Sequence, residues 1–211
     1  MHHVDSKAHK QKVLEHLLSN GESSKSLIFT ATKRGADQLS KILRDKGHKS
    51  GALHGDMSQN KRRQTVENLR KGRLNTLVAT DVAARGLDIK DISHVINFDL
   101  PMVAEDYIHR IGRTGRAGAT GQAVSLVGSA DWKKLSQIEK LTSRKIKRET
   151  IDGLEPTSSE PKSPGARKPN QKPRRRFGKA TEPSTARKPG HWRKAESKGK
   201  RSKVSRVKKA A

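Results

Sequence analysis

The stretch SLIFTATKRGADQLSKILRDKG, residues 26–47, decides the structural class of the chain. It begins with a short apolar run, SLIFT, bounded by turn residues, as a buried parallel strand is. Apolar side chains then recur at helical spacing, which predicts an amphipathic helix over 33–46 that ends before Gly47. The inward-facing residues of this helix are Ala36, Leu39, Ile42 and Leu43. A strand followed directly by a helix is the repeating unit of an α/β fold.

The same unit recurs on both sides of this stretch. Short apolar runs predict further strands over 50–53, 75–79, 94–98, 121–127 and 146–149. Amphipathic patterns predict helices over 5–19, 59–71, 104–112 and 130–142, and Ser58 is suited to cap the second of these. Because strands alternate with helices, the sequence predicts a parallel α/β sheet with helices on both faces.

Polar residues gather directly after several of the predicted strands. These clusters span 30–32, 54–56, 80–88 and the residues from Asp99 onward. In a parallel sheet the carboxyl ends of the strands share one edge, and ligands bind there. Each cluster alone could consist of turn residues only. Taken together, the clusters predict one ligand-binding edge.

Composition limits the kind of protein this is. The chain has 211 residues and no cysteine, which excludes disulfides and thiolate metal sites and favours a reducing, cytoplasmic location. The start MHHVDSKAHK is polar, unlike a signal peptide, and no apolar run is long enough to span a bilayer. The histidines form no convincing metal set, so we predict no metal ligands and no membrane partner.

Positive charge is concentrated toward the C-terminus. The formal net charge is +26, and the residues from Pro156 onward hold 19 Lys and Arg against 3 acidic residues. Seven of the eight prolines also lie there, with few large apolar side chains, so we expect a disordered basic tail over 153–211. This charge points to a polyanionic partner, with nucleic acid ahead of an anionic membrane surface.

The stretch YIHRIGRTGRAG, residues 107–118, spaces Arg110, Arg113 and Arg116 three apart, with glycines between them. Like charges at this spacing repel one another on a helix, and interior glycines weaken the helix. A chain that keeps both features is expected to place an anion among these arginines. A solvated Arg/Gly linker has the same composition and is the alternative.

Four motifs together resemble the C-terminal RecA-like lobe of DEAD-box RNA helicases, over residues 4–152. They are LIFTATK, HGDMSQNKRR, VATDVAARGLDI and YIHRIGRTGR, in that order. His109 in the last motif favours this group over DNA-directed helicases, whose lobe is a weaker alternative. On this resemblance, residues 1–3 are a vector or linker remnant. The basic tail resembles those of bacterial RhlE-type helicases, which implies ribosomal precursor particles as a partner.

The resemblance implies a nucleotide site. Arg113 and Arg116 match arginine fingers that stabilise charge on the γ-phosphoryl group of ATP, a role suited to the planar, permanently charged guanidinium. His109 matches a residue that bridges the nucleotide site to the other lobe. Asp88 matches an acidic group that contacts the ATP ribose, and Gly86 belongs to the same cofactor-binding set.

The resemblance also implies contacts to the RNA backbone. Thr80 matches a hydroxyl on an RNA phosphate, and Gln59 and Arg62 match another phosphate contact from one helix face. The full set that the resemblance implies is Thr32, Gly55, Gln59, Arg62, Thr80 and Arg85. Without the resemblance, Arg62 and its neighbour Arg63 would be interpreted as a solvated helix face. Contacts to the backbone imply slight sequence preference.

Two motifs that a complete motor needs are missing from the sequence. There is no G-x-x-x-x-G-K-[ST] loop to cradle phosphates and no DEAD tetrad for Mg²⁺. ATP with Mg²⁺ would therefore be bound mainly by an N-terminal RecA-like lobe, and the chain is expected to be an inactive piece of an ATP-dependent RNA helicase. The alternative is an ATP-independent RNA-binding or chaperone protein.

Overall fold

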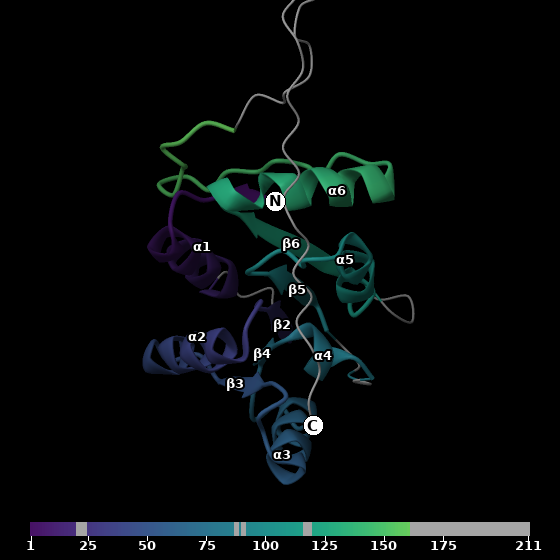
Figure 1. Cartoon of the computed structure of the whole chain (residues 1–211). Helices are drawn as coiled ribbons and strands as arrows, with labels where there is room; N and C mark the ends of the chain where they lie inside the picture. Colours follow the sequence, from purple (N-terminus) through teal and green to yellow (C-terminus); the bar gives the residue numbers. More distant parts are fainter. Residues whose placement is uncertain (20–24, 87–88, 90–91, 116–119, 161–211) are drawn as a thin grey trace, which may run out of the picture. The chain divides into compact units, whose positions relative to one another are not determined.

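A computed structural model of the chain describes residues 1–19, 25–86, 89, 92–115 and 120–160 (Figure 1). The strands within these residues form one parallel sheet in the order β1-β6-β5-β2-β4-β3. They are β1 (His2–His3), β2 (Ser26–Phe29), β3 (Ser50–Leu53), β4 (Thr76–Ala79), β5 (His94–Asn97) and β6 (Gln122–Val127). The predicted parallel α/β sheet is confirmed, and the predicted strand over 26–30 is its central strand β2.

Helices connect the strands, as the alternation predicts. They are α1 (Lys7–Ser19), α2 (Lys33–Asp45), α3 (Gln59–Arg70), α4 (Asp81–Ala84), α5 (Ala104–Ile111) and α6 (Trp132–Thr142), with a 3₁₀ turn η1 (Ser129–Asp131) before α6. Ser58 caps α3 as predicted, since its hydroxyl accepts a hydrogen bond from the Lys61 amide at 3.4 Å. Gly47 follows α2 with a φ of +89°, the left-handed conformation that glycine adopts freely at helix ends.

The sheet is covered on both faces because its side chains alternate. In β2, Ile28 packs toward α1 and α2, whereas Leu27 and Phe29 pack on the opposite face with α3 and α4. Figure 1 shows α1 and α2 together beside one face of the sheet. A third apolar cluster joins α5 and α6 to the β6 side and includes Leu100, Tyr107, Val127, Leu135 and Ile138.

The N-terminal residues pack with the sheet. His2 and His3 of β1 pair in parallel with Leu126 and Val127 of β6. Met1 is buried in the apolar cluster of α5 and α6. Residues 1–3, which the resemblance assigned to a vector or linker remnant, thus fold together with the domain.

The strand predicted over 146–149 is not present. Its backbone is tied to a single residue, because the Met1 amine donates to the Lys147 carbonyl at 2.5 Å and the Glu149 amide donates to the Met1 carbonyl at 2.9 Å. The Ile146 amide donates instead to the Glu139 carboxylate of α6 at 2.9 Å. Side-chain and terminal groups thus take the bonds that a strand ladder would need.

The first residues of the predicted tail pack on the domain. Ile151 and Leu154 contact the cluster beneath α1, and the Leu154 carbonyl lies 3.0 Å from His9 Nε2. The Asp5 carboxylate accepts hydrogen bonds from the Thr157 and Ser158 amides at 2.7 and 2.9 Å. The folded unit therefore extends beyond residue 152, where we placed its end. The rest of the predicted disordered tail, 161–211, lies outside the described residues.

Candidate functional site

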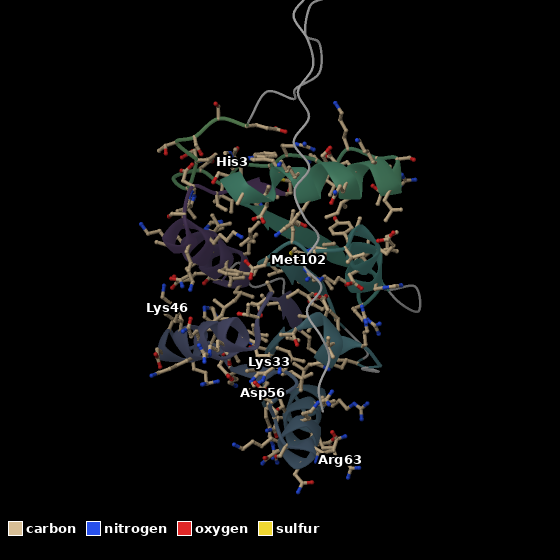
Figure 2. All side chains as sticks on the ribbon, viewed as in Figure 1. His3, Lys33, Lys46, Asp56, Arg63 and Met102 are labelled. Atoms are coloured by element: carbon tan, nitrogen blue, oxygen red, sulfur yellow. The ribbon has the colours of Figure 1, made fainter. Side chains whose placement is uncertain are left out.

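The loops that follow the strands meet at the carboxyl edge of the sheet. After β5, the Asp99 carboxylate accepts a hydrogen bond from the Ala31 amide, which follows β2, at 3.0 Å. Lys33 of α2 forms an ion pair with Asp56, which follows β3, at 2.5 Å (Figure 2). These contacts join clusters from separate loops, and the predicted single edge is the result of the parallel topology.

Arg110 of α5 is buried at this edge, with only 2% of its surface exposed. Its Nε and Nη2 donate to the two oxygens of Asp81 at 2.6 and 2.8 Å. Its Nη1 donates to Asn97 Oδ1 at 2.9 Å and to the Asp99 carbonyl at 2.6 Å. The guanidinium also lies 4.8 Å from the centroid of the Phe29 ring. This planar fork is fully used in joining α5 to α4, β5 and β2.

The expectation that three arginines surround one anion is therefore corrected at Arg110. Its charge is already balanced within the protein, so it cannot also serve an external phosphate. Arg113, on the loop after α5, is half-buried and lines a shallow pocket with His109, Arg85 and Asp81. Arg116 lies outside the described residues, and so does Asp88.

Arg85, Asp106 and His109 form a second charged group beside this pocket. Arg85 Nη2 donates to Asp106 Oδ1 at 2.7 Å, and His109 Nδ1 lies 3.6 Å from the same oxygen. The hydrogen bond from Arg85 is the main reason that the pKa of the Asp106 carboxyl lies below its usual value. Both Arg85 and His109 have well-exposed side chains, at 62% and 67%, so an external ligand can reach either one.

A basic groove runs between α3 and the turn after α4. It has a volume of about 610 Å³, and we call it the α3 groove. Its polar lining includes Gln59, Arg62, Arg63, Arg70, Arg85 and Gly86. Gly86 has a φ of +75°, which a residue with a side chain rarely adopts, so the turn that presents Arg85 depends on glycine. The Arg63 side chain projects outward from α3 (Figure 2).

Three predicted RNA-binding residues lie outside the lining of the α3 groove. Thr80 is 8% exposed and precedes α4. The Thr32 hydroxyl accepts a hydrogen bond from the Gly35 amide at 3.0 Å, so it already caps α2. Gly55 is exposed, and a Cβ atom there would approach only the flexible Lys33 side chain, at 3.5 Å. The structure therefore gives no steric reason for a glycine at position 55.

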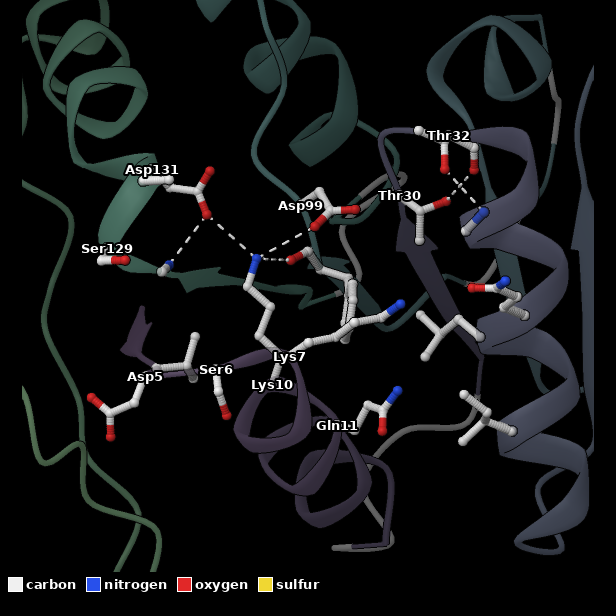
Figure 3. A pocket seen from close by; sticks show the side chains of 18 of the residues that line it. Asp5, Ser6, Lys7, Lys10, Gln11, Thr30, Thr32, Asp99, Ser129 and Asp131 are labelled. Carbon is white, nitrogen blue, oxygen red and sulfur yellow. Dashed lines mark hydrogen bonds and ion pairs between the residues drawn. The ribbon is translucent and has the colours of Figure 1, made fainter.

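A further pocket, separate from the shallow pocket and the α3 groove, has a volume of about 450 Å³ and lies between the N-terminal ends of α1 and α2 (Figure 3). Lys10 crosses it and donates to the Phe98 carbonyl at 2.9 Å, while its Nζ lies 3.4 Å from both Asp99 and Asp131. Lys10 thus fastens α1 to the loops after β5 and β6. Thr30 and Thr32 line the opposite wall.

The glycine-rich loop after α5 is anchored by its threonine. Thr114 Oγ1 donates to the Ile92 carbonyl at 2.5 Å and lies 3.1 Å from the Ser93 carbonyl. Gly121 packs against this anchor so closely that an added Cβ would lie 2.1 Å from Thr114 Oγ1 and 2.4 Å from the Gly115 amide nitrogen. One glycine of the series therefore exists for packing. Gly115, with a φ of +66°, exists for the turn.

The described residues contain neither a metal-binding cluster nor a membrane-spanning helix. Across these ranges, no three His, Asp or Glu side chains lie close enough together to hold a metal ion. Within the same part of the chain, no helix combines the length and the apolar character needed to cross a bilayer.

Sequence reasoning missed the acidic and amide partners of the site. Asp81, Asn97 and Asp106 hold Arg110 and Arg85, yet none was predicted as a site residue. Asp81 stands next to Thr80 within a quoted motif, so it carried a signal. Asp106 precedes YIHR and carried none, because its partner Arg85 is distant in sequence.

Comparison with known proteins gives consistent matches. The family described as helicase conserved C-terminal domain matches residues 9–118. ATP-dependent RNA helicase SrmB of Haemophilus influenzae is 45% identical over 161 residues, which cover 76% of this chain and 37% of that protein. SrmB of Escherichia coli is 43% identical over 158 residues, covering 75% and 36%. The chain thus spans little more than a third of these curated relatives.

Solved structures agree with the sequence matches. The crystal structure of E. coli DEAD-box protein SrmB bound to regulator of ribonuclease activity A is similar with a TM-score of 0.74 at 42% identity, covering 76% of this chain and 95% of that chain. A DEAD box protein from the hyperthermophile Methanococcus jannaschii gives a TM-score of 0.66 at 40% identity, covering 71% and 41%.

Proposed function

This chain belongs to the helicase conserved C-terminal domain family, as the C-terminal RecA-like lobe of a DEAD-box protein, and from this premise we propose that it works in an ATP-dependent RNA helicase. One observation carries the proposal. Arg85 lines both the shallow pocket that contains Arg113 and His109 and the α3 groove that contains Gln59 and Arg62. The pocket proposed for the nucleotide and the groove proposed for RNA are therefore adjacent, with Arg85 in the lining of both.

The shallow pocket is proposed as this lobe's contribution to ATP hydrolysis. Three arginines line the pocket, Arg85, Arg110 and Arg113, against two carboxylates, Asp81 and Asp106, so this lining has a formal excess of one positive charge. A guanidinium at Arg113 can stabilise charge that develops on a transferred phosphoryl group. Arg116 and Asp88 keep their proposed roles as second arginine finger and ribose contact.

ATP and Mg²⁺ are proposed to be held mainly by an N-terminal RecA-like lobe. The sequence quoted above contains neither the phosphate-binding loop nor the DEAD tetrad that would hold them. Mg²⁺ would neutralise the phosphates, while this chain would supply guanidinium groups across the interface. Activity is therefore proposed for the two lobes together.

The α3 groove is proposed to hold the RNA backbone. Arg62, Arg63, Arg70 and Arg85 line it, and guanidinium groups bind phosphate oxygens in a planar, bidentate way. Phosphate contacts position a strand without identifying its bases, so binding is expected to be almost independent of sequence. Thr32, Gly55 and Thr80 remain proposed contacts outside the groove.

The test joins an N-terminal DEAD-box lobe to this chain and measures RNA-stimulated ATP hydrolysis. Arg113→Lys keeps the charge and removes the planar fork, so turnover should fall by about 10³-fold or more while RNA affinity is kept. Arg62→Ala should instead weaken RNA binding and raise the RNA concentration needed for stimulation. Unchanged turnover in Arg113→Lys would refute the arginine-finger role.

The alternative, an ATP-independent RNA-binding or chaperone protein, is favoured if the joined protein anneals RNA without responding to ATP. The basic composition of residues 156–211 suits that activity as well. Ribosomal precursor particles as a partner and a cytoplasmic location remain proposals that rest on the resemblance of the tail and on the lack of cysteine.

A further inference from the structure

Asp106 lies between the residue proposed to contact RNA and the residue proposed to face the other lobe. Its side chain is 19% exposed, in the first turn of α5. Arg85 Nη2 and His109 Nδ1 approach the same oxygen, Asp106 Oδ1, at 2.7 and 3.6 Å. The first distance is a full hydrogen bond, and the second is just too long for one. In this arrangement Asp106 Oδ1 accepts its hydrogen bond from Arg85 and not from His109.

Asp106 is the carboxylate that both Arg85 and His109 approach, because the neighbouring acidic residues are bound elsewhere or lie outside the pocket lining. Asp81, from α4, is bound by both sides of the Arg110 fork. Arg113 lines the same pocket and adds positive charge. Glu105 is exposed on α5 and is not part of the pocket lining.

We propose that Asp106 is a positioning residue that couples the two parts of the site: an RNA phosphate that binds Arg85 releases Asp106 Oδ1 to His109. This rests on the proposed function for the contact between RNA and Arg85. A phosphate is a competing acceptor for the same guanidinium, and an exposed ion pair is weak enough to be exchanged. Once released, Asp106 holds the His109 ring by Nδ1 and turns Nε2 outward. RNA binding thereby sets the orientation and the tautomer of His109.

The first arm of the test needs no RNA. A neutral imidazole carries its proton on one of two nitrogens, and a carboxylate beside one nitrogen favours the form with the proton on that nitrogen, because a carboxylate accepts hydrogen bonds. Nitrogen NMR of the full chain, at a pH where the rings are neutral, reports the ratio of the Nδ1–H to the Nε2–H form of His109. Arg85→Ala should raise this ratio by about twofold, the effect expected of an exposed charged hydrogen bond. In Arg85→Ala combined with Asp106→Asn the rise should disappear.

Glu105→Gln is the matched control, because it removes the same charge from the same turn of α5. It should leave the response to Arg85→Ala intact. His16 and His48 give reference signals in the same spectra. If the Nδ1–H to Nε2–H ratio of His109 is the same in Arg85→Ala as in the natural protein, the proposal that Arg85 and His109 share Asp106 is refuted, whatever the effect of RNA.

The second arm adds a short oligouridylate to the full chain. RNA should raise the Nδ1–H ratio of His109 in the natural protein and in Glu105→Gln, and should cause no further change in Arg85→Ala or Asp106→Asn. If RNA binds but the ratio stays constant in the natural protein, the coupling is refuted while RNA binding stands. If the signals of residues around Arg85 do not respond to RNA at all, the proposed RNA contact fails, and the coupling fails with it.

Discussion

At the scale of single residues, the same side-chain type serves opposite purposes within one short motif. Arg110 is buried and holds the fold together, whereas Arg113 faces a pocket three residues later. Burial separates the two, since Arg110 is buried and needs partners within the protein, whereas Arg113 is only half-buried. Identity and spacing along the chain do not distinguish them.

Replacing Arg110 should destabilise the domain strongly. Arg110→Met keeps an apolar side chain of similar length but removes the guanidinium that pairs with Asp81 and Asn97 and lies over the Phe29 ring. Breaking such a buried pair costs about 3 kcal/mol. Asp81 is partly exposed, at 26%, which places the loss at the low end of the usual range. Urea unfolding followed by circular dichroism measures it. Arg63→Ala, on the exposed surface of α3, should change the free energy of unfolding by less than about 0.5 kcal/mol.

Gly121 should tolerate no side chain. The methyl group of Gly121→Ala would overlap Thr114 Oγ1 and the Gly115 backbone, and backbone cannot move aside cheaply. We expect a loss of about 1–3 kcal/mol in the free energy of unfolding and changed NMR signals for residues 112–115. Gly55→Ala is the control, since its Cβ meets ordinary contacts only. Equal stability of the two variants would contradict this packing.

At the scale of elements, residues outside regular structure complete the domain. The coil over 143–160 covers the outer edge of β1 and packs Ile151 and Leu154 under α1. Asp5, just before α1, holds the end of this coil by hydrogen bonds to Thr157 and Ser158. The coil over 143–160, which has no periodic sequence pattern, thus covers part of the hydrophobic core.

The Asp5 contact should depend on pH. The Ser158 hydroxyl, followed by the Thr157 and Ser158 amides, lowers the pKa of the Asp5 carboxyl well below its usual range. Because the folded-state pKa is lowered, the contact stabilises the fold fully above the unfolded-state pKa of about 3.9. This stabilisation is lost progressively as the pH falls from there toward the lower folded-state pKa.

Hydrogen exchange at the Thr157 and Ser158 amides should report this loss. Protection is expected to be constant above about pH 5 and to fall on further acidification. Asp5→Asn should remove most of it at neutral pH, and Asp152→Asn, an exposed acid in the same coil, should not. Protection that survives in Asp5→Asn would show that packing of Leu154 holds the coil without the carboxylate.

At the scale of the whole molecule, charge is divided between a lobe with a defined groove and a basic C-terminal sequence. If residues 161–211 anchor RNA, binding of the full chain should depend steeply on salt. Engaging about a third of the basic groups beyond Pro156 gives a log–log slope near −4 on single strands.

Cutting the chain after Glu160 tests the anchor and keeps the contacts of Thr157 and Ser158 with Asp5. The slope should flatten and the affinity at low salt should fall. Arg62→Ala in the full chain should lower the slope by only about one unit. An unchanged slope after the cut would assign the tail to another partner.

The sequence by itself determined the class of fold, the helices α1, α2, α3, α5 and α6 and the edge where the site lies, because periodicity, caps and turns are local properties. The short helix α4 was not predicted. The resemblance further implied Gln59, Arg62 and Arg85 as RNA contacts, and all three line the α3 groove. Only the tertiary structure decided that residues 2–3 form a strand, that 146–149 do not, that Arg110 is structural and that Asp106 belongs to the site. Each of these depends on a partner that is remote in the chain, and one sequence contains no record of such pairs.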